Sequence, residues 1–155
     1  MGGMEASAFA QAMRQWLWLY PSVEIVHLVG IAILVGSIAV LDLRLLGISR
    51  ALSVRRLAAH VLPWTLAGFA LIVPSGFAMF VAHASDLISS PVFALKLSLV
   101  ALAGVNAAVF HTGVFRSAVN WDVDILPPLA ARAAAAASLL IWVSVIACGR
   151  LLAYT

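Results

Sequence analysis

Four histidines are the residues of this 155-residue chain whose type and spacing could do chemistry. They are His27, His60, His83 and His111, and each lies within a long apolar segment or at its edge. Neutral imidazole is a good axial ligand for haem iron, and facing helices of a bundle can hold cofactors on inward side chains. The pattern therefore predicts a non-covalently held b-type haem, with these four histidines as candidate iron ligands.

Depth along the apolar segments sorts the histidines into two layers. His27 and His83 are expected near the outer membrane boundary, and His60 and His111 near the inner one. One spacing opposes a two-haem arrangement, because His60 and His83 are 23 residues apart. On an ideal helix that is about 34 Å and about 140° of rotation, so one face of a straight helix cannot serve two haems.

Space and charge add to the haem hypothesis. Gly30 and Ser37 share a helix face with His27, and their small size is expected to leave room for a flat macrocycle. Lys96 and Arg150, near the outer boundary, are candidates to bind the haem propionates. Lys96 has two other interpretations, an ion pair with Glu24 across helices or snorkelling to the lipid headgroups.

The elements that position these residues are membrane spans. The chain is 65% hydrophobic and 10% charged, where soluble domains have about 25% charged residues. Apolar segments long enough to cross a hydrocarbon core of about 30 Å predict four transmembrane helices. The expectation is an all-α, single-domain four-helix bundle over residues 1–155, with an interfacial N-terminal helix at about 4–20 and spans at about 21–47, 57–84, 91–114 and 129–153.

Charged residues near the span ends suggest further roles. Pro74, inside the second span, is expected to kink its helix. Asp42 and Arg44 lie together at the end of the first span, which favours a helix-end anchor over a site.

The net charge of +3 is too small and scattered to indicate a nucleic-acid partner. A single cysteine, Cys148, excludes an internal disulfide and gives no motif for covalent haem attachment.

The sequences HLVGIAILVGSIAVLDLRLLG (27–47), FALKLSLVALAGVNAAVFH (93–111) and GRLLAY (149–154) carry a resemblance to known proteins. Over nearly the whole chain they resemble a family of small bacterial inner-membrane proteins of unassigned function, with DLRLLG as the most specific motif. More loosely, the plan is similar to membrane b-type cytochromes and the copper-resistance D-type superfamily. This second resemblance implies haem b and electron transfer between quinone and a periplasmic partner, with His27 and His111 first, then Lys96 and Arg150, as site residues.

Basic residues predict the orientation in a bacterial inner membrane. On the four-span plan six arginines face the cytoplasm and three basic residues face outward, which places both termini in the periplasm. The first group is Arg44, Arg50, Arg55, Arg56, Arg116 and Arg132, and the second is Arg14, Lys96 and Arg150.

Three functions stay open at this point. The leading one is a b-type haem protein that carries electrons. The second is a cofactor-free membrane anchor or accessory subunit, alone, as a homo-oligomer or within a larger complex. The third is a small transporter or metal-permease component that uses His27, Asp42 and His111 along a polar path. The sequence contains no nucleophile-and-base pattern, phosphate-binding loop or zinc motif, so hydrolytic chemistry has no support.

Overall fold

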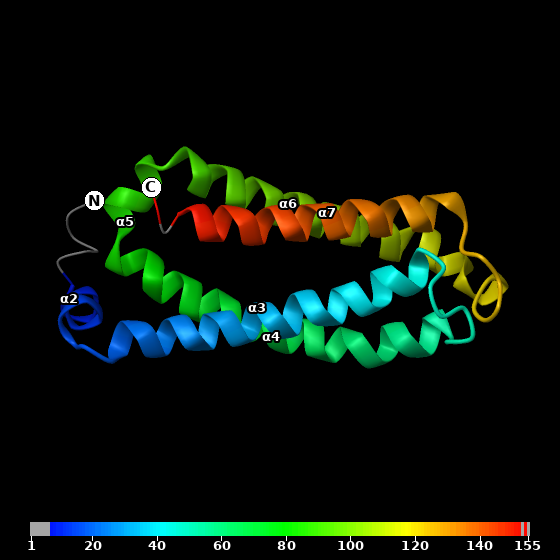
Figure 1. Ribbon diagram of the computed structural model, residues 1–155, viewed down its shortest axis with the longest axis horizontal. Helices are drawn as coiled ribbons and strands as arrows, with labels where there is room; N and C mark the ends of the chain where they lie inside the picture. The colour runs from blue at the N-terminus through cyan, green and yellow to red at the C-terminus, as the bar shows by residue number, and fades with distance from the viewer. Residues whose placement is uncertain (1–6, 153, 155) are drawn as a thin grey trace.

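The computed structural model describes residues 7–152 and 154 of the chain. This part is all-α and carries four long apolar helices that run side by side (Figure 1). The elements in order are α2 (Ala8–Gln15), α3 (Leu19–Leu45), α4 (Val54–Ala82), α5 (Ala84–Ser89), α6 (Pro91–Thr112), the 3₁₀ helix η1 (Val114–Asn120) and α7 (Leu129–Leu151).

The four long helices confirm the predicted fold class. Helices α3, α4, α6 and α7 contain 27, 29, 22 and 23 residues, and each is apolar enough to cross a membrane. Their outward surfaces expose many large apolar side chains, which lipid solvates and water does not. The protein is therefore a multi-pass membrane protein.

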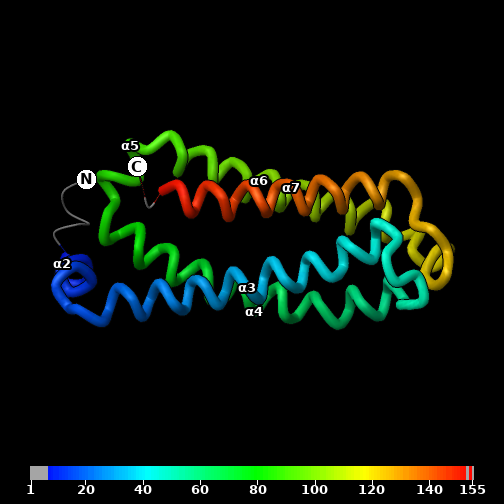
Figure 2. The backbone as a smooth tube through the Cα atoms, viewed as in Figure 1, coloured from blue at the N-terminus to red at the C-terminus, as the bar shows by residue number. Residues whose placement is uncertain are grey.

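The bundle is built from two helical hairpins. Helix α3 packs along α4, and α6 packs along α7, while contact between the hairpins comes mainly from α3 against α7. Figure 2 shows α2, α5 and the end of α7 at one end of the bundle, which we call the terminal end. The α3–α4 connection and residues 113–128 lie at the opposite end, the loop end.

The observed helix ends differ from the predicted spans for local reasons. Helix α2 covers only 8 residues of the expected 4–20, and residues 1–6 lie outside the described part. Helix α3 begins at Leu19, so Pro21 lies in its first turn, where proline costs no hydrogen bond. Helix α4 begins three residues early because the Ser53 hydroxyl accepts a hydrogen bond from the Arg56 amide, 3.2 Å away.

The connections contain more helix than expected. The short outer loop after α4 forms α5, and the polar loop before α7 starts as η1, with Ala118 and Trp121 buried. Helix α6 ends at Thr112 and α7 at Leu151, each slightly before the predicted limit, and residue 153 is outside the described part. Helix α4 continues through both Pro63 and Pro74.

Helices α3 and α4 approach most closely at two glycines. A Cβ on Gly68 would lie 2.8 Å from the Leu34 amide nitrogen and 3.0 Å from the Gly30 carbonyl oxygen. A Cβ on Gly30 would likewise meet Ile72 and Leu71 at 2.9 and 3.0 Å. The expectation that Gly30 leaves room for a macrocycle is therefore wrong, because α4 already fills that space.

A purely apolar zone fills the middle of the bundle. It contains buried side chains from three helices and is extended by Val35, Ile38, Phe69, Ile72, Leu99 and Val100. We call it the central apolar layer and define it by Leu34, Ala103, Ile141, Trp142 and Val145. His27 and Asp42 therefore lie on opposite sides of this layer, while the hydrogen-bonded hydroxyls of Ser37 and Thr65 lie beside it.

Candidate functional site

His27 is held by a serine of the neighbouring helix. Its Nδ1 lies 2.9 Å from the Ser75 hydroxyl oxygen, and that hydroxyl donates its single hydrogen to the Leu71 carbonyl at 2.5 Å. The Ser75 hydroxyl has two carbonyl acceptors, Leu71 and Ile72, which favours the tautomer in which a protonated Nδ1 donates to Ser75. This arrangement leaves a lone pair on Nε2, and such a hydrogen bond on the far nitrogen is how metal-ligating histidines are oriented.

Small residues and one cation surround this histidine layer. The His27 ring packs directly against Gly76 of α4, since a Cβ there would lie 3.1 Å from the His27 Cε1. Across the bundle, the Lys96 ammonium lies 3.6 Å from where a Cβ of Gly149 would be. Lys96 is half-buried within α6 and close enough for its charge to act on His27.

The expected ion pair between Glu24 and Lys96 is not formed. Glu24 is exposed, and neither residue has a hydrogen-bond or ion-pair partner within the described part of the chain. Arg150 instead donates to the Tyr154 hydroxyl at 2.5 Å and lies 4.9 Å from the centre of that ring. Lys96 is thus the cation of this layer that is left for an acidic ligand group.

The histidine pairs that the sequence suggested do not meet. His83 ends α4 with its ring edge-on to Tyr20, eight residues beyond Ser75 and so about 12 Å further along the helix. His111 packs against Phe110 and Phe115, while His60 is exposed and lines a different hollow. A haem held between two histidines of this chain does not fit this arrangement.

An internal cavity of about 250 Å³ lies between the central apolar layer and the loop end. All four long helices line it, and most of its wall is apolar. Its polar lining groups are Asp42, Thr65, Asn106, His111 and Ser138.

Asp42 is the unusual member of this cavity. Its side chain is 6% exposed, the Ser138 hydroxyl hydrogen-bonds the carboxyl, and the second oxygen, Oδ2, is buried with no partner. Arg44 does not neutralise it, because positions i and i+2 of a helix point in different directions. The expectation of a joint Asp42–Arg44 helix-end anchor is therefore wrong for Asp42, and an acid inside a membrane bundle is a candidate functional group.

Arg44 instead stabilises the loop end. Its side chain is 2% exposed, its Nε donates to the Leu52 carbonyl at 2.6 Å, and its Nη2 donates to the carbonyls of Arg50 and Asp122, each at 3.0 Å. The arginine thereby ties the α3–α4 connection to the segment before α7. Of the six arginines that predicted the orientation, this one is a buried structural group.

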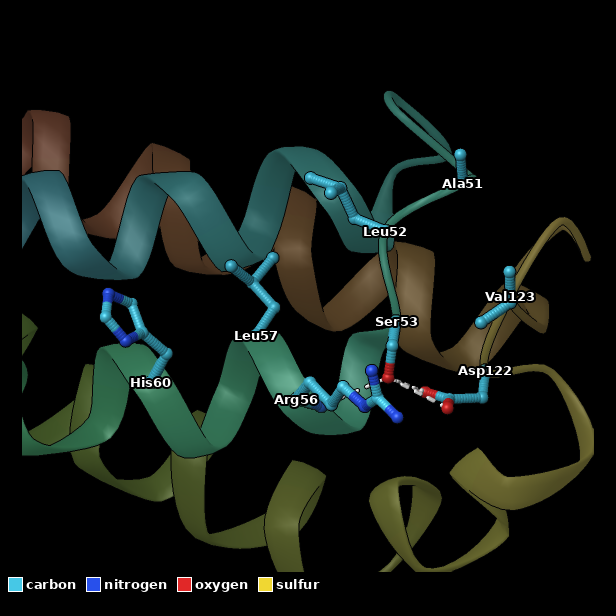
Figure 3. A pocket seen from close by; sticks show the side chains of 8 residues that line it. All are labelled: Ala51, Leu52, Ser53, Arg56, Leu57, His60, Asp122 and Val123. Atoms are coloured by element: carbon cyan, nitrogen blue, oxygen red, sulfur yellow. Dashed lines mark hydrogen bonds between the residues drawn. The ribbon is translucent and has the colours of Figure 1, made fainter.

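Asp122 completes this clamp from the other side (Figure 3). Its carboxylate accepts hydrogen bonds from the Ser53 hydroxyl, at 3.0 and 2.9 Å, and from the Arg55 amide at 2.8 Å. Partial desolvation raises the pKa of Asp122, but these hydrogen bonds and the charges of Arg55 and Arg44 outweigh it and lower the pKa below 3.8. His60 lies further along the same open hollow, away from Asp122.

Sequence reasoning missed the serines that position the site. The role of Ser53 could have been predicted, because a serine directly before a helical segment is a typical N-cap. Ser75 and Ser138 carried no such signal, since each is an ordinary polar residue within an apolar span until its partner on α3 is known. Among residues 7–152 and 154, no group of three or more His, Cys, Asp or Glu side chains could hold a metal ion.

The fold and these two polar layers define a small four-helix integral membrane protein with ionisable side chains inside its bundle. Residues 13–155 match the model of DUF6644, described as a family of unknown function, and the chain belongs to that family. No curated protein and no solved structure matches the chain.

Proposed function

We propose that the protein is a membrane b-type haem protein that carries electrons, with His27 as the iron ligand contributed by this chain. The observation that carries the proposal is the hydrogen-bond sequence from His27 Nδ1 through Ser75 to the Leu71 carbonyl. It favours the tautomer that leaves a lone pair on Nε2, on a half-buried ring that α4 holds in place. A haem bound there would supply one-electron chemistry.

The other residues of the layer have supporting roles in this proposal. Ser75 orients the imidazole, and the absence of a side chain at Gly76 lets the ring lie against α4. Lys96 would bind an acidic substituent of the cofactor, because an unpaired ammonium inside a membrane span gains from an anionic partner. Arg150 is engaged with Tyr154 at the terminal end and is a weaker candidate for the same role.

The terminal end is the proposed periplasmic end, so His27 would lie on the side of a periplasmic redox partner, with quinone as the membrane partner. Both partners come from the resemblance to membrane b-type cytochromes. Because the pairs His27–His83 and His60–His111 do not meet, the proposal is for one haem whose second axial position is not filled by a histidine of this chain.

The test is an absorption spectrum of the detergent-purified protein, oxidised and then reduced with dithionite, after expression with ample haem. We expect sharp reduced α and Soret bands that are lost in His27→Ala. Ser75→Ala should keep the haem but lower its affinity, because the ligand loses its orienting hydrogen bond. Ser144→Ala is the matched control, since the Ser144 hydroxyl only donates to the Leu140 carbonyl of its own helix.

Two outcomes would contradict the proposal. A colourless protein would show that no haem is bound. The contact between His27 and Ser75 would then be a packing contact, as expected of a cofactor-free anchor or accessory subunit. Bands that persist in His27→Ala but vanish in His111→Ala would move the cofactor to the inner cavity.

A further inference from the structure

The cavity around Asp42 has hydrogen-bond acceptors that the protein itself does not satisfy. Oδ2 of Asp42 is buried and unpartnered. Asn106 uses its amide nitrogen to donate to the Ala134 carbonyl at 3.0 Å, which leaves its own carbonyl oxygen without a donor within the described residues. Thr65 cannot help, because its hydroxyl is already bonded to Val61 and Ser37.

The buried Asp42 oxygen requires a donor, and the oxygen of the half-buried Asn106 is a second acceptor on the cavity wall. Leaving a polar group unsatisfied inside an apolar environment costs about 1–3 kcal/mol, and more for a charged group. The nearby arginine of α3, Arg44, directs its Nε and Nη2 donors to loop carbonyls, its Nη1 has no partner among the described residues, and none of these hydrogen bonds reaches Asp42. A molecule that enters the cavity with a hydroxyl or amine group would therefore find two acceptors ready for it.

The size of the cavity limits that molecule to about one ring. Its volume is about 250 Å³, whereas an apolar cavity of about 150 Å³ is enough to bind benzene. One six-membered ring with short substituents fits, and the apolar wall, including Phe69 and Trp142, suits a ring.

The way into the cavity leads from the lipid. Helices α4 and α6 hardly touch, and the cavity is lined by exposed residues of both, Leu62 and Leu66 on α4 and Gly104 and Ala107 on α6. Nothing lies within 4 Å of where a Cβ of Gly104 would be. A ligand with an apolar tail could thus place its ring beside Asp42 while the tail stays in the bilayer.

We propose that this cavity binds the single-ring head of a lipid-soluble molecule that donates a hydrogen bond to Asp42, a quinol or a ring-bearing amine. A quinol would be the membrane partner of the proposed function, and to that extent the inference rests on it. Binding itself needs no haem at His27, because the central apolar layer separates the two places.

Titration calorimetry of the purified protein in detergent tests the binding directly, whether or not the protein carries haem. The probes are a benzoquinol with a ten-carbon tail, its oxidised quinone, and a benzylamine with the same tail. We expect the quinol or the amine to bind at least tenfold more tightly than the quinone, which offers only acceptors. The probe that binds shows whether the natural ligand is a quinol or an amine.

Two sets of variants separate this site from a general affinity for detergent and lipid. Asp42→Leu removes the acceptor at a cost of about 1–3 kcal/mol, because the Ser138 hydroxyl loses its partner. Asp42→Asn is therefore measured beside it, since its amide oxygen can still accept from Ser138 while the second acceptor oxygen is replaced by a donor. Both substitutions should weaken donor binding at least tenfold, and Asp86→Asn, an exposed acid in α5, should not. Gly104→Leu narrows the opening and should weaken binding, whereas Gly36→Leu, equally open but outside the cavity lining, should not.

Equal binding of quinol and quinone, or donor binding that survives Asp42→Leu, would overturn the inference. So would the absence of binding by all three probes. None of these results would affect the absorption spectrum on which the haem proposal depends, so the two proposals fail separately.

Discussion

Gly30 of α3 and Gly68 of α4 face each other where the two helices cross, and neither position has room for a side chain. The shortest clearance is 2.8 Å, between an added Cβ at Gly68 and the Leu34 amide nitrogen. Small residues at such crossings let backbones approach and gain van der Waals contact, which drives helix association in lipid. This crossing fixes how the first hairpin presents His27 and Asp42 to the second.

Gly68→Ala should therefore destabilise the protein by about 1–3 kcal/mol, the usual cost of overpacking. Gly36→Ala is the control on the neighbouring helix, since nothing lies within 4 Å of its added Cβ. Unfolding by SDS, followed by circular dichroism, measures both. A Gly68→Ala variant as stable as Gly36→Ala would contradict the close crossing.

Arg44→Lys tests the clamp at the loop end. One ammonium nitrogen cannot reach the three carbonyls of Leu52, Arg50 and Asp122, which the guanidinium serves from two nitrogens, Nε and Nη2. We expect a loss of about 2 kcal/mol in the same SDS titration. Arg116→Lys, which changes an exposed arginine beside the same end of the bundle, should be neutral.

Asp122 makes stability depend on pH at the acidic end. Its pKa is lowered below 3.8 in the folded protein, so the unfolded chain takes up the proton first as pH falls. The stabilisation is then complete above the unfolded value and is lost as pH falls through the folded pKa. Asp122→Asn should be less stable than the wild type at pH 7, and the two should converge at the lowest pH that the detergent tolerates.

The orientation of the bundle can be read by labelling. In a Cys148→Ala background, which removes the buried native thiol, we expect Asp86→Cys to react with an impermeant maleimide in intact spheroplasts. Val119→Cys, which is 65% exposed at the loop end, should react only after lysis. The reverse pattern would invert the predicted topology, with both termini in the cytoplasm.

The helices were predictable because membrane thickness sets their length. An apolar run of this length has few alternatives in lipid, and Ser90 followed by Pro91 marks the start of α6 as sequence rules expect. The divergence of Asp42 and Arg44 was also predictable, since residues two apart on a helix do not face each other. The anchor hypothesis overlooked this rule.

The surroundings of the candidate site were not predictable. Whether Gly30 makes room for a ligand or for a helix depends on Gly68, which is 38 positions away in the sequence. The pairing of histidines depends on how two hairpins sit against each other, and hydropathy carries no information on that. Ser75 and Ser138 became meaningful only once His27 and Asp42 lay opposite them.

The central apolar layer has a consequence for the energised membrane. A buried acid that exchanges protons with both sides of the membrane would conduct protons down their gradient and lower the membrane potential. Leu34, Ile141 and Trp142 close the bundle between Asp42 and His27, so neither group can hand a proton directly to the other. The five residues that define this layer have no side chain that could relay a carboxyl proton, so the layer opposes a proton leak through the bundle.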